Sequence, residues 1–246
     1  MFATNFSIGT VSTGEQCVDM TPKYAAGQQF PGVAFVHGAG STADYCLQPE
    51  PANQAALTQK VGSRFPAISG DNGGLLTWGN SLSLSRLGLY VQRLANRPDT
   101  TNEYALVSAS MGGLVSFNFA AQAVKKPRAI VSVIPVINLN DIYLNNRDGY
   151  GAGIGAAYGG SYNEAMHGTT NNPYAMRDMD KLKDIPMLLF YGLTDTLCRP
   201  EFTEEFAAAD PGNRILVPLE SGHDYTSYAN VDHDMIVQFL EEHLNA

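Results

Sequence analysis

Short apolar runs rich in β-branched residues recur along the chain, separated by segments whose apolar positions follow helical spacing. Such runs are typical of strands buried on both faces of a parallel sheet. The expected strands lie at 32–36, 65–69, 104–107, 129–134, 187–192 and 214–219, and the expected helices at 51–65, 84–94, 111–125 and 235–244. Strand and helix therefore alternate, which predicts an α/β fold with a mostly parallel, twisted sheet flanked by helices.

Two segments depart from this alternation. Residues 1–28 alternate loosely between apolar and polar positions, which predicts one or two edge strands. Residues 137–185 are rich in Asn, Gly and Tyr and contain no expected strand. About fifty residues without a strand inside a compact domain indicate a functional segment. The glycine-rich stretch at 151–156 does not lie between a strand and a helix, which excludes a dinucleotide-binding fingerprint there.

Composition narrows the class of protein. Of the 246 residues 44% are apolar and 16% charged, which fits one well-packed α/β domain over 1–246, although two small domains also fit the length. The formal net charge is −9 and no cluster of Lys and Arg exceeds a pair, which argues against nucleic acid or an anionic membrane surface as a partner. No stretch reaches the roughly 20 apolar residues of a membrane span, and no export signal is visible. We expect a soluble, cytoplasmic protein.

The cysteines give a weaker indication of compartment. Cys17, Cys46 and Cys198 are odd in number and far apart, which fits reduced thiols better than a disulfide framework. A bridge between Cys17 and Cys46 stays open at this point.

The strand expected at 104–107 runs into a Ser/Gly-rich turn and then an apolar segment of helical length. This order places Ser110 at the tip of a sharp turn from a buried strand into a buried helix. A serine hydroxyl becomes a nucleophile when such a turn exposes it, when a base lies within reach, and when a helix N-terminus offers N–H groups to an oxyanion. The small residues Ser108, Gly112 and Gly113 permit the turn.

This turn resembles the nucleophile elbow of the α/β-hydrolase family, Gly-x-Ser-x-Gly, with Ser108 in place of the first glycine. A second segment is similar to the family as well: His37-Gly38-Ala39 follows the expected strand at 32–36. The resemblance implies that the N–H groups of Ala39 and Met111 form the oxyanion hole. It covers roughly residues 30–244.

The resemblance also implies the other two members of a catalytic triad. Asp195 follows the strand at 187–192, where the family keeps its acid, and His223 follows the strand at 214–219, where the family keeps its base. The order Ser110, Asp195, His223 is the chain order of α/β-hydrolases. Glu220 and Asp224 flank the histidine and are the alternatives for the acid.

Asp232-His233-Asp234 raises the question of a metal site. Adjacent residues on a helix point in different directions and cannot converge on one ion, so we interpret this segment as a charged helix N-terminus and expect no metal.

The mechanism implied is acyl transfer to Ser110 and release by water, with no cofactor. The expected substrate is a small-molecule ester or a lipid or envelope ester, although the same residues serve thioesterases, amidases and acyltransferases. The alternative is a catalytically inactive binding or virion structural module that keeps the fold. The sequence leaves the oligomeric state open.

In the family, segment 137–185 is the position of a lid or cap, and we expect a small mobile lid there. Tyr150 and Tyr158 within it, and Trp78 in the glycine-rich loop 70–80, are candidate substrate contacts. A rigid insertion is the alternative for 137–185. The loop 70–80 and the lid also look like hydrolases encoded by actinobacterial phages, which would make the protein virion-associated.

Overall fold

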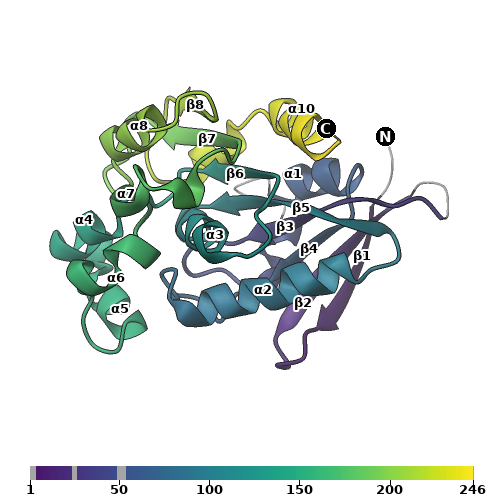
Figure 1. Ribbon diagram of the computed structural model, residues 1–246, viewed down its shortest axis with the longest axis horizontal. Helices are drawn as coiled ribbons and strands as arrows, with labels where there is room; N and C mark the ends of the chain where they lie inside the picture. Colours follow the sequence, from purple (N-terminus) through teal and green to yellow (C-terminus); the bar gives the residue numbers. More distant parts are fainter. Residues whose placement is uncertain (1–3, 24–26, 49–53, 246) are drawn as a thin grey trace.

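The computed structural model describes residues 4–23, 27–48 and 54–245. Within these ranges eight strands form one sheet (Figure 1). The strands are β1 (Thr4–Thr10), β2 (Gln16–Pro22), β3 (Phe30–Val36), β4 (Ala67–Gly70), β5 (Thr100–Ala109), β6 (Ala129–Val133), β7 (Met187–Gly192) and β8 (Arg214–Leu219). Their order across the sheet is β1-β2-β4-β3-β5-β6-β7-β8.

The pairing confirms the expected fold class. Strands β4, β3, β5, β6, β7 and β8 are parallel, whereas β1 pairs with β2, and β2 with β4, in antiparallel fashion. The edge strands expected within residues 1–28 are therefore observed as the hairpin of β1 and β2, and residues 1–3 and 24–26 lie outside the described ranges. Because the six parallel strands run in one direction, the loops that follow them meet at one edge of the sheet.

Helices cover both faces of the sheet (Figure 1). They are α1 (Gln54–Gly62), α2 (Ser81–Ala95), α3 (Met111–Gln122), α4 (Leu139–Leu144), α5 (Gly151–Ala157), α6 (Glu164–Asn171), α7 (Pro173–Met176), α8 (Pro200–Ala208), α9 (Tyr225–Ala229) and α10 (His233–Leu244), with the 3-10 helices η1 (Ala43–Leu47), η2 (Arg147–Gly149) and η3 (Asp180–Leu182). Apolar side chains of α1 and α10 pack on one face, and those of α2, α3 and α8 on the other.

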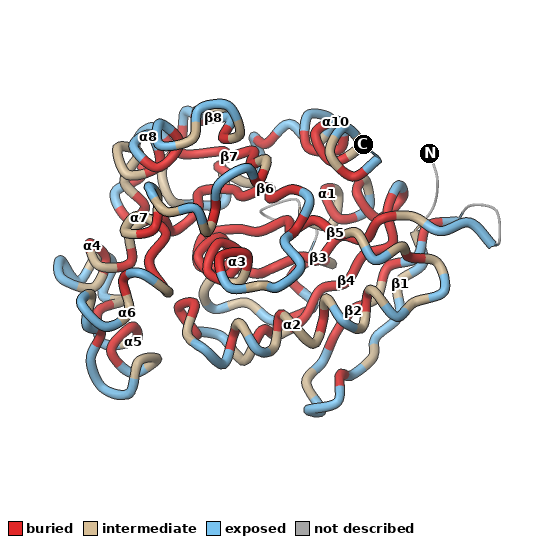
Figure 2. Tube along the Cα trace, viewed as in Figure 1, coloured by how far each residue is buried: buried red, intermediate tan, exposed pale blue. Residues whose placement is uncertain are grey.

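Helix α3 is buried nearly all round (Figure 2), in agreement with its almost uniformly apolar sequence. It ends at Gln122, three residues earlier than expected, because Ala123 already has extended backbone angles. The helix expected at 51–65 is observed as α1, and residues 51–53 lie outside the described ranges.

Segment 137–185 contains only helices and loops, from α4 to η3 (Figure 1). It has its own apolar cluster, in which Ile142 and Ile154 pack against Met111 and Leu114 at the start of α3. No helix in the described ranges is both long and apolar enough to cross a membrane.

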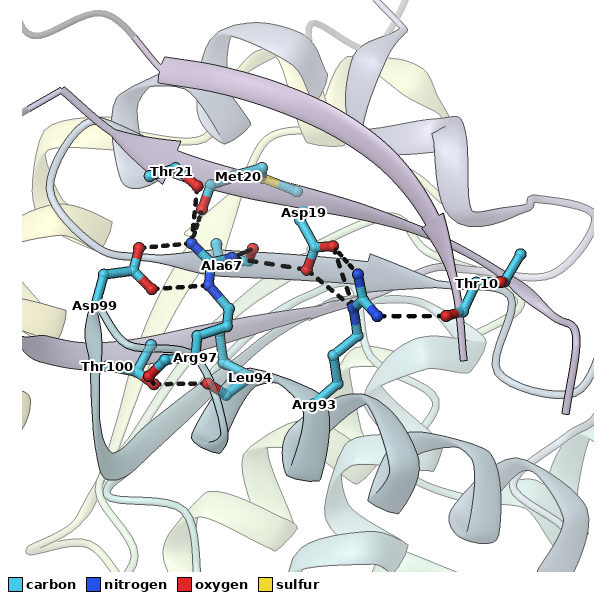
Figure 3. A network of polar contacts seen from close by, with 10 residues as sticks. All are labelled: Thr10, Asp19, Met20, Thr21, Ala67, Arg93, Leu94, Arg97, Asp99 and Thr100. Atoms are coloured by element: carbon cyan, nitrogen blue, oxygen red, sulfur yellow. Dashed lines mark hydrogen bonds and ion pairs between the residues drawn. The ribbon is translucent and has the colours of Figure 1, made fainter. Parts of the chain in front are cut away.

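Arg93 of α2 and Arg97, which lies just after the C-terminus of that helix, attach the edge hairpin to the parallel sheet (Figure 3). Arg93 donates to both carboxylate oxygens of Asp19 on β2. Arg97, whose side chain is 13% exposed, donates to the carbonyl oxygens of Met20 and Ala67 and forms an ion pair with Asp99 at 2.7 Å. One guanidinium therefore joins β2, β4 and the loop before β5.

This network predicts a large effect of Arg97→Ala on stability. The variant leaves a half-buried carboxylate and two strand carbonyls without their donor, so we expect the free energy of unfolding to fall by about 2–3 kcal/mol. Lys125→Ala, which breaks an exposed ion pair with Glu103, is the control and should cost less than about 1 kcal/mol. Urea unfolding of both variants measures the difference, and equal losses would contradict this account.

Candidate active site

Ser110 lies at the tip of the turn between β5 and α3, with φ 50° and ψ −119°. This conformation is rare outside glycine and costs about 1–3 kcal/mol, so the surroundings must hold it. Its backbone N–H donates to the carbonyl of Val133, and its carbonyl accepts from the N–H groups of Gly113 and Val136. The strained turn is thus fixed from both sides.

The two glycines after the serine are required by close packing. A Cβ at Gly112 would lie 2.1 Å from the carbonyl oxygen of Val36, and one at Gly113 would lie 2.6 Å from Ser132 Oγ. Any side chain at these positions would push α3 away from β3 or β6. Ser108, which replaces the first glycine of the family pattern, fits because its buried hydroxyl donates to Ser132 Oγ at 2.9 Å.

Ser110, His223 and Asp195 form a continuous hydrogen-bonded chain. Ser110 Oγ lies 2.9 Å from His223 Nε2, and His223 Nδ1 lies 2.7 Å from Asp195 Oδ2. A carboxylate can only accept a hydrogen bond, so its partner Nδ1 carries the proton and Nε2 is left to accept from the serine hydroxyl. The side chain of Asp195 is fully buried, whereas that of His223 is 15% exposed.

The carboxylate of Asp195 is held by its own loop. Asp195 Oδ1 accepts from the backbone N–H groups of Leu197 at 2.9 Å and Cys198 at 2.7 Å. The loop is joined to the histidine loop because Thr194 N–H donates to the carbonyl of Ser221. Asp195 and His223, far apart in sequence, are thereby fixed relative to each other.

Cys198 places a thiol beside this pair. Burial and the neighbouring Asp195 carboxylate raise the pKa of the thiol well above its usual range, so it is neutral around pH 7. All three cysteines, Cys17, Cys46 and Cys198, are free and buried. The bridge between Cys17 and Cys46 that the sequence left open is therefore not formed.

Two backbone N–H groups lie near the serine without a hydrogen-bond partner among the described residues, those of Ala39 and Met111. Met111 is the first residue of α3, where N–H groups have no partner within the helix. Ala39 follows β3 in a loop braced by His37, whose ring nitrogens each lie 2.8 Å from a carbonyl oxygen, of Gly38 and of Asp71.

A pocket of about 300 Å³ opens above Ser110 and His223. No lysine or arginine is among the described residues that line it, and Asp224 at its rim has a pKa lowered by hydrogen bonds from Thr226. Four tyrosines contribute to the wall: Tyr45, Tyr150, Tyr225 and Tyr228. The pocket therefore combines aromatic surface with negative charge.

Of the three candidate substrate contacts, Tyr150 lines this pocket, whereas Trp78 and Tyr158 lie behind it. Trp78 is 1% exposed and packs edge-on against Tyr150, with 4.9 Å between ring centroids. Tyr158 donates its hydroxyl hydrogen to the carbonyl of Trp78. Trp78 therefore supports Tyr150 by packing against its ring, and Tyr158, within segment 137–185, holds the backbone of Trp78.

The hydrogen bond to His223 Nδ1 comes from Asp195 and from neither of the two alternative acids. Glu220 is exposed, and Asp224 caps the N-terminus of α9 through Thr226 N–H. Asp232 caps α10 by accepting from Asp234 and Met235, so the segment around His233 is the charged helix start that the sequence indicated.

Sequence reasoning missed several residues of the site. Tyr228 lines the pocket, and burial raises the pKa of its hydroxyl. Tyr45 contributes from η1, and Cys198 lies beside the acid. The one signal in the sequence was that each of these residues lies within a few positions of a predicted site residue: Tyr228 near His223, Tyr45 near Ala39, and Cys198 near Asp195.

No family profile and no curated protein matches the sequence. Solved structures do resemble it. An esterase of Pyrococcus furiosus superimposes with a TM-score of 0.68 at 18% identity, over 99% of this chain and 92% of its own. An S-formylglutathione hydrolase of Agrobacterium tumefaciens gives 0.70 at 13% identity, over 99% and 96%. A ferulic acid esterase gives 0.71 at 11% identity, over 100% and 99%.

The resemblance to phage-encoded hydrolases finds no support among these structures. Structural similarity at identities this low indicates a shared fold and does not indicate a shared substrate. The sheet order, the turn at Ser110 and superposition over nearly the whole chain agree: the protein has the α/β-hydrolase fold.

Proposed function

We propose that the protein is a serine hydrolase that cleaves a small carboxylic ester through an acyl-enzyme on Ser110. The observation that supports this most strongly is the hydrogen-bonded chain from Ser110 through His223 to the buried Asp195. A serine, a neutral imidazole and a carboxylate in this order provide the nucleophile, the base and the group that orients the base.

The reaction follows from the protonation states. His223 Nε2 takes the proton of Ser110 as Oγ attacks the acyl carbon, and Asp195 stabilises the imidazolium that forms. The same proton then passes to the alcohol oxygen as the ester bond breaks. Water, deprotonated by His223, attacks the acyl-enzyme, and collapse of the second intermediate returns the proton to Ser110 and releases the acid.

The oxyanion hole is assigned to the N–H groups of Ala39 and Met111. Neither is engaged in a hydrogen bond to a described residue, and Met111 adds the positive end of α3. N–H groups fixed by the backbone need no reorganisation as negative charge develops on the substrate oxygen. Such preorganised donors usually supply the largest part of the stabilisation of an acyl-transfer transition state.

The pocket favours a short, uncharged or cationic substrate. A volume of about 300 Å³ lies at the lower limit for ligand pockets, which is small for a long acyl chain. Negative charge at the rim and from the protein as a whole opposes anionic substrates. We assign segment 137–185 as a lid that contributes Tyr150 to this pocket and supplies no member of the triad.

Ser110→Ala and His223→Ala should each lower kcat for p-nitrophenyl acetate by roughly four orders of magnitude or more, because the triad acts as a unit. His233→Ala should stay within about twofold, since His233 lies at the start of α10 outside the pocket. Steady-state kinetics and thermal unfolding of each variant check this. A Ser110→Ala enzyme that keeps its rate would remove Ser110 as the nucleophile.

Asp195→Asn and Glu220→Gln separate the proposed acid from its alternative. The amide at 195 would favour the wrong tautomer of His223, so we expect a fall in kcat of about 10⁴-fold. Glu220→Gln should leave kcat within about twofold of the unaltered protein. Glu220 is exposed, and the hydrogen bond to His223 Nδ1 is made by Asp195. The reverse pattern in kinetic assays would transfer the acid role to Glu220.

A series of p-nitrophenyl esters tests the size of the acyl site. Acetate and butyrate should be cleaved with kcat/KM at least about tenfold higher than decanoate, because each methylene that the pocket excludes forfeits its burial energy. Tyr150→Ala should lower the ratio of acetate to decanoate kcat/KM, because it enlarges the pocket. Tyr225→Phe is the control: it keeps the aromatic ring at another position of the pocket wall, so the ratio should stay as in the unaltered protein. A preference for decanoate in the unaltered protein would contradict the assignment.

A further inference from the structure

We infer that Asp195, Cys198 and His223 form a binding site for a thiophilic divalent cation such as Zn²⁺ or Cd²⁺, and that its occupation inhibits hydrolysis. One ligand atom from each residue lies within 4.8 Å of the other two. Binding requires only these side chains, whereas inhibition rests on the proposed function.

The geometry requires small movements. Ligand bonds of about 2.0–2.3 Å in a tetrahedral zinc site place ligand atoms roughly 3.3–3.8 Å apart. His223 Nδ1 and Asp195 Oδ2, now 2.7 Å apart, would separate by about 0.6–1.1 Å, and Cys198 Sγ would approach them by at most about 1.5 Å. Side-chain rotation covers such distances, so the two loops can keep their backbone hydrogen bonds.

The donor set matches the cation. Thiolate, imidazole and carboxylate are the ligands that zinc takes in proteins, and sulfur favours Zn²⁺ and Cd²⁺ over Mg²⁺ and Ca²⁺. The two negative charges of the carboxylate and the thiolate together neutralise the charge of the divalent cation, which lowers the free-energy cost of burying the ion. In the metal-free protein the thiol is protonated because burial and Asp195 raise its pKa, so binding releases that proton to solvent.

Binding would stop catalysis through the imidazole. A metal ion on Nδ1 requires the other tautomer, with the proton on Nε2. Nε2 then donates to Ser110 Oγ instead of accepting its proton, and the hydrogen bond from Nδ1 to Asp195 is lost. The ion has a route of entry, because His223 lines the pocket and its side chain is 15% exposed.

Inhibition by Zn²⁺ and Cd²⁺ of esterase activity tests the site. Three proteins are assayed: the unaltered chain, Cys198→Ser, and Cys46→Ser. The last is a matched control, because the buried thiol of Cys46 donates to the carbonyl of Ala43. The rate of each protein with metal is divided by its own rate without metal. We expect Cys198→Ser to need at least about tenfold more metal for half inhibition, and Cys46→Ser to respond as the unaltered protein does. EDTA should restore the rate. Equal sensitivity of all three proteins would overturn the inference.

A second measurement does not depend on activity. Cd²⁺ is titrated into Ser110→Ala protein while the charge-transfer absorption of a cadmium–thiolate bond is followed. We expect one Cd²⁺ per chain, and loss of the band when Cys198→Ser is added to the variant. Absence of the band would overturn the metal site. If the band formed but the unaltered protein, with Ser110 intact, hydrolysed no ester, the metal site would stand and the proposed function would fail.

Discussion

The close approach of α3 to the end of β3 is the constraint on which the site depends. Only a residue without a side chain at 112 fits against the carbonyl oxygen of Val36, and this contact sets where the helix begins. The strained backbone of Ser110 follows from the same geometry, because the chain must leave β5 and enter α3 within one residue. The hydrogen bonds to Val133 and Val136 offset that strain.

The same packing arranges the charges of the site. The N-terminus of α3 follows Ser110 directly, Ala39 of the loop after β3 lines the same pocket, and the loops after β7 and β8 bring Asp195 and His223 into the hydrogen-bonded chain. Because these loops follow parallel strands, they meet at one edge of the sheet. Full burial of Asp195 keeps water from competing for His223, so the imidazole is oriented before substrate arrives.

The sequence predicted those parts of the protein that local rules determine. Parallel strands read as apolar runs, so the fully buried β7 and the partly exposed edge strand β8 were both located to the residue. The turn at Ser110 followed from glycines that close packing requires. Features that depend on how segments distant in sequence pack together could not be predicted from the sequence. Trp78 lies in a loop whose composition suggested a ligand site, but tertiary packing places it under Tyr150.

The sequence did not predict that Cys198 and Tyr228 lie at the site, for the same reason: neither belongs to a recognisable pattern, and the fold alone brings Cys198 to Asp195 and Tyr228 to the pocket. Hydrogen bonds also join segment 137–185 to the rest of the protein in ways that no periodicity encodes. Arg147 donates to the carbonyl of Thr196 in the loop of the acid, and Asn80 donates to the carbonyl of Ala157.

The central claim, that Ser110 is activated by His223, is tested most directly by covalent labelling with a fluorophosphonate, followed by mass spectrometry of the digested protein. Such reagents phosphonylate neither ordinary surface serines nor a serine without a base, because the hydroxyl alone is too weak a nucleophile to displace fluoride from phosphorus. The account predicts a single phosphonate adduct on the peptide that contains Ser110, and its absence from His223→Ala protein. An unlabelled chain, or an adduct that persists without His223, would contradict it.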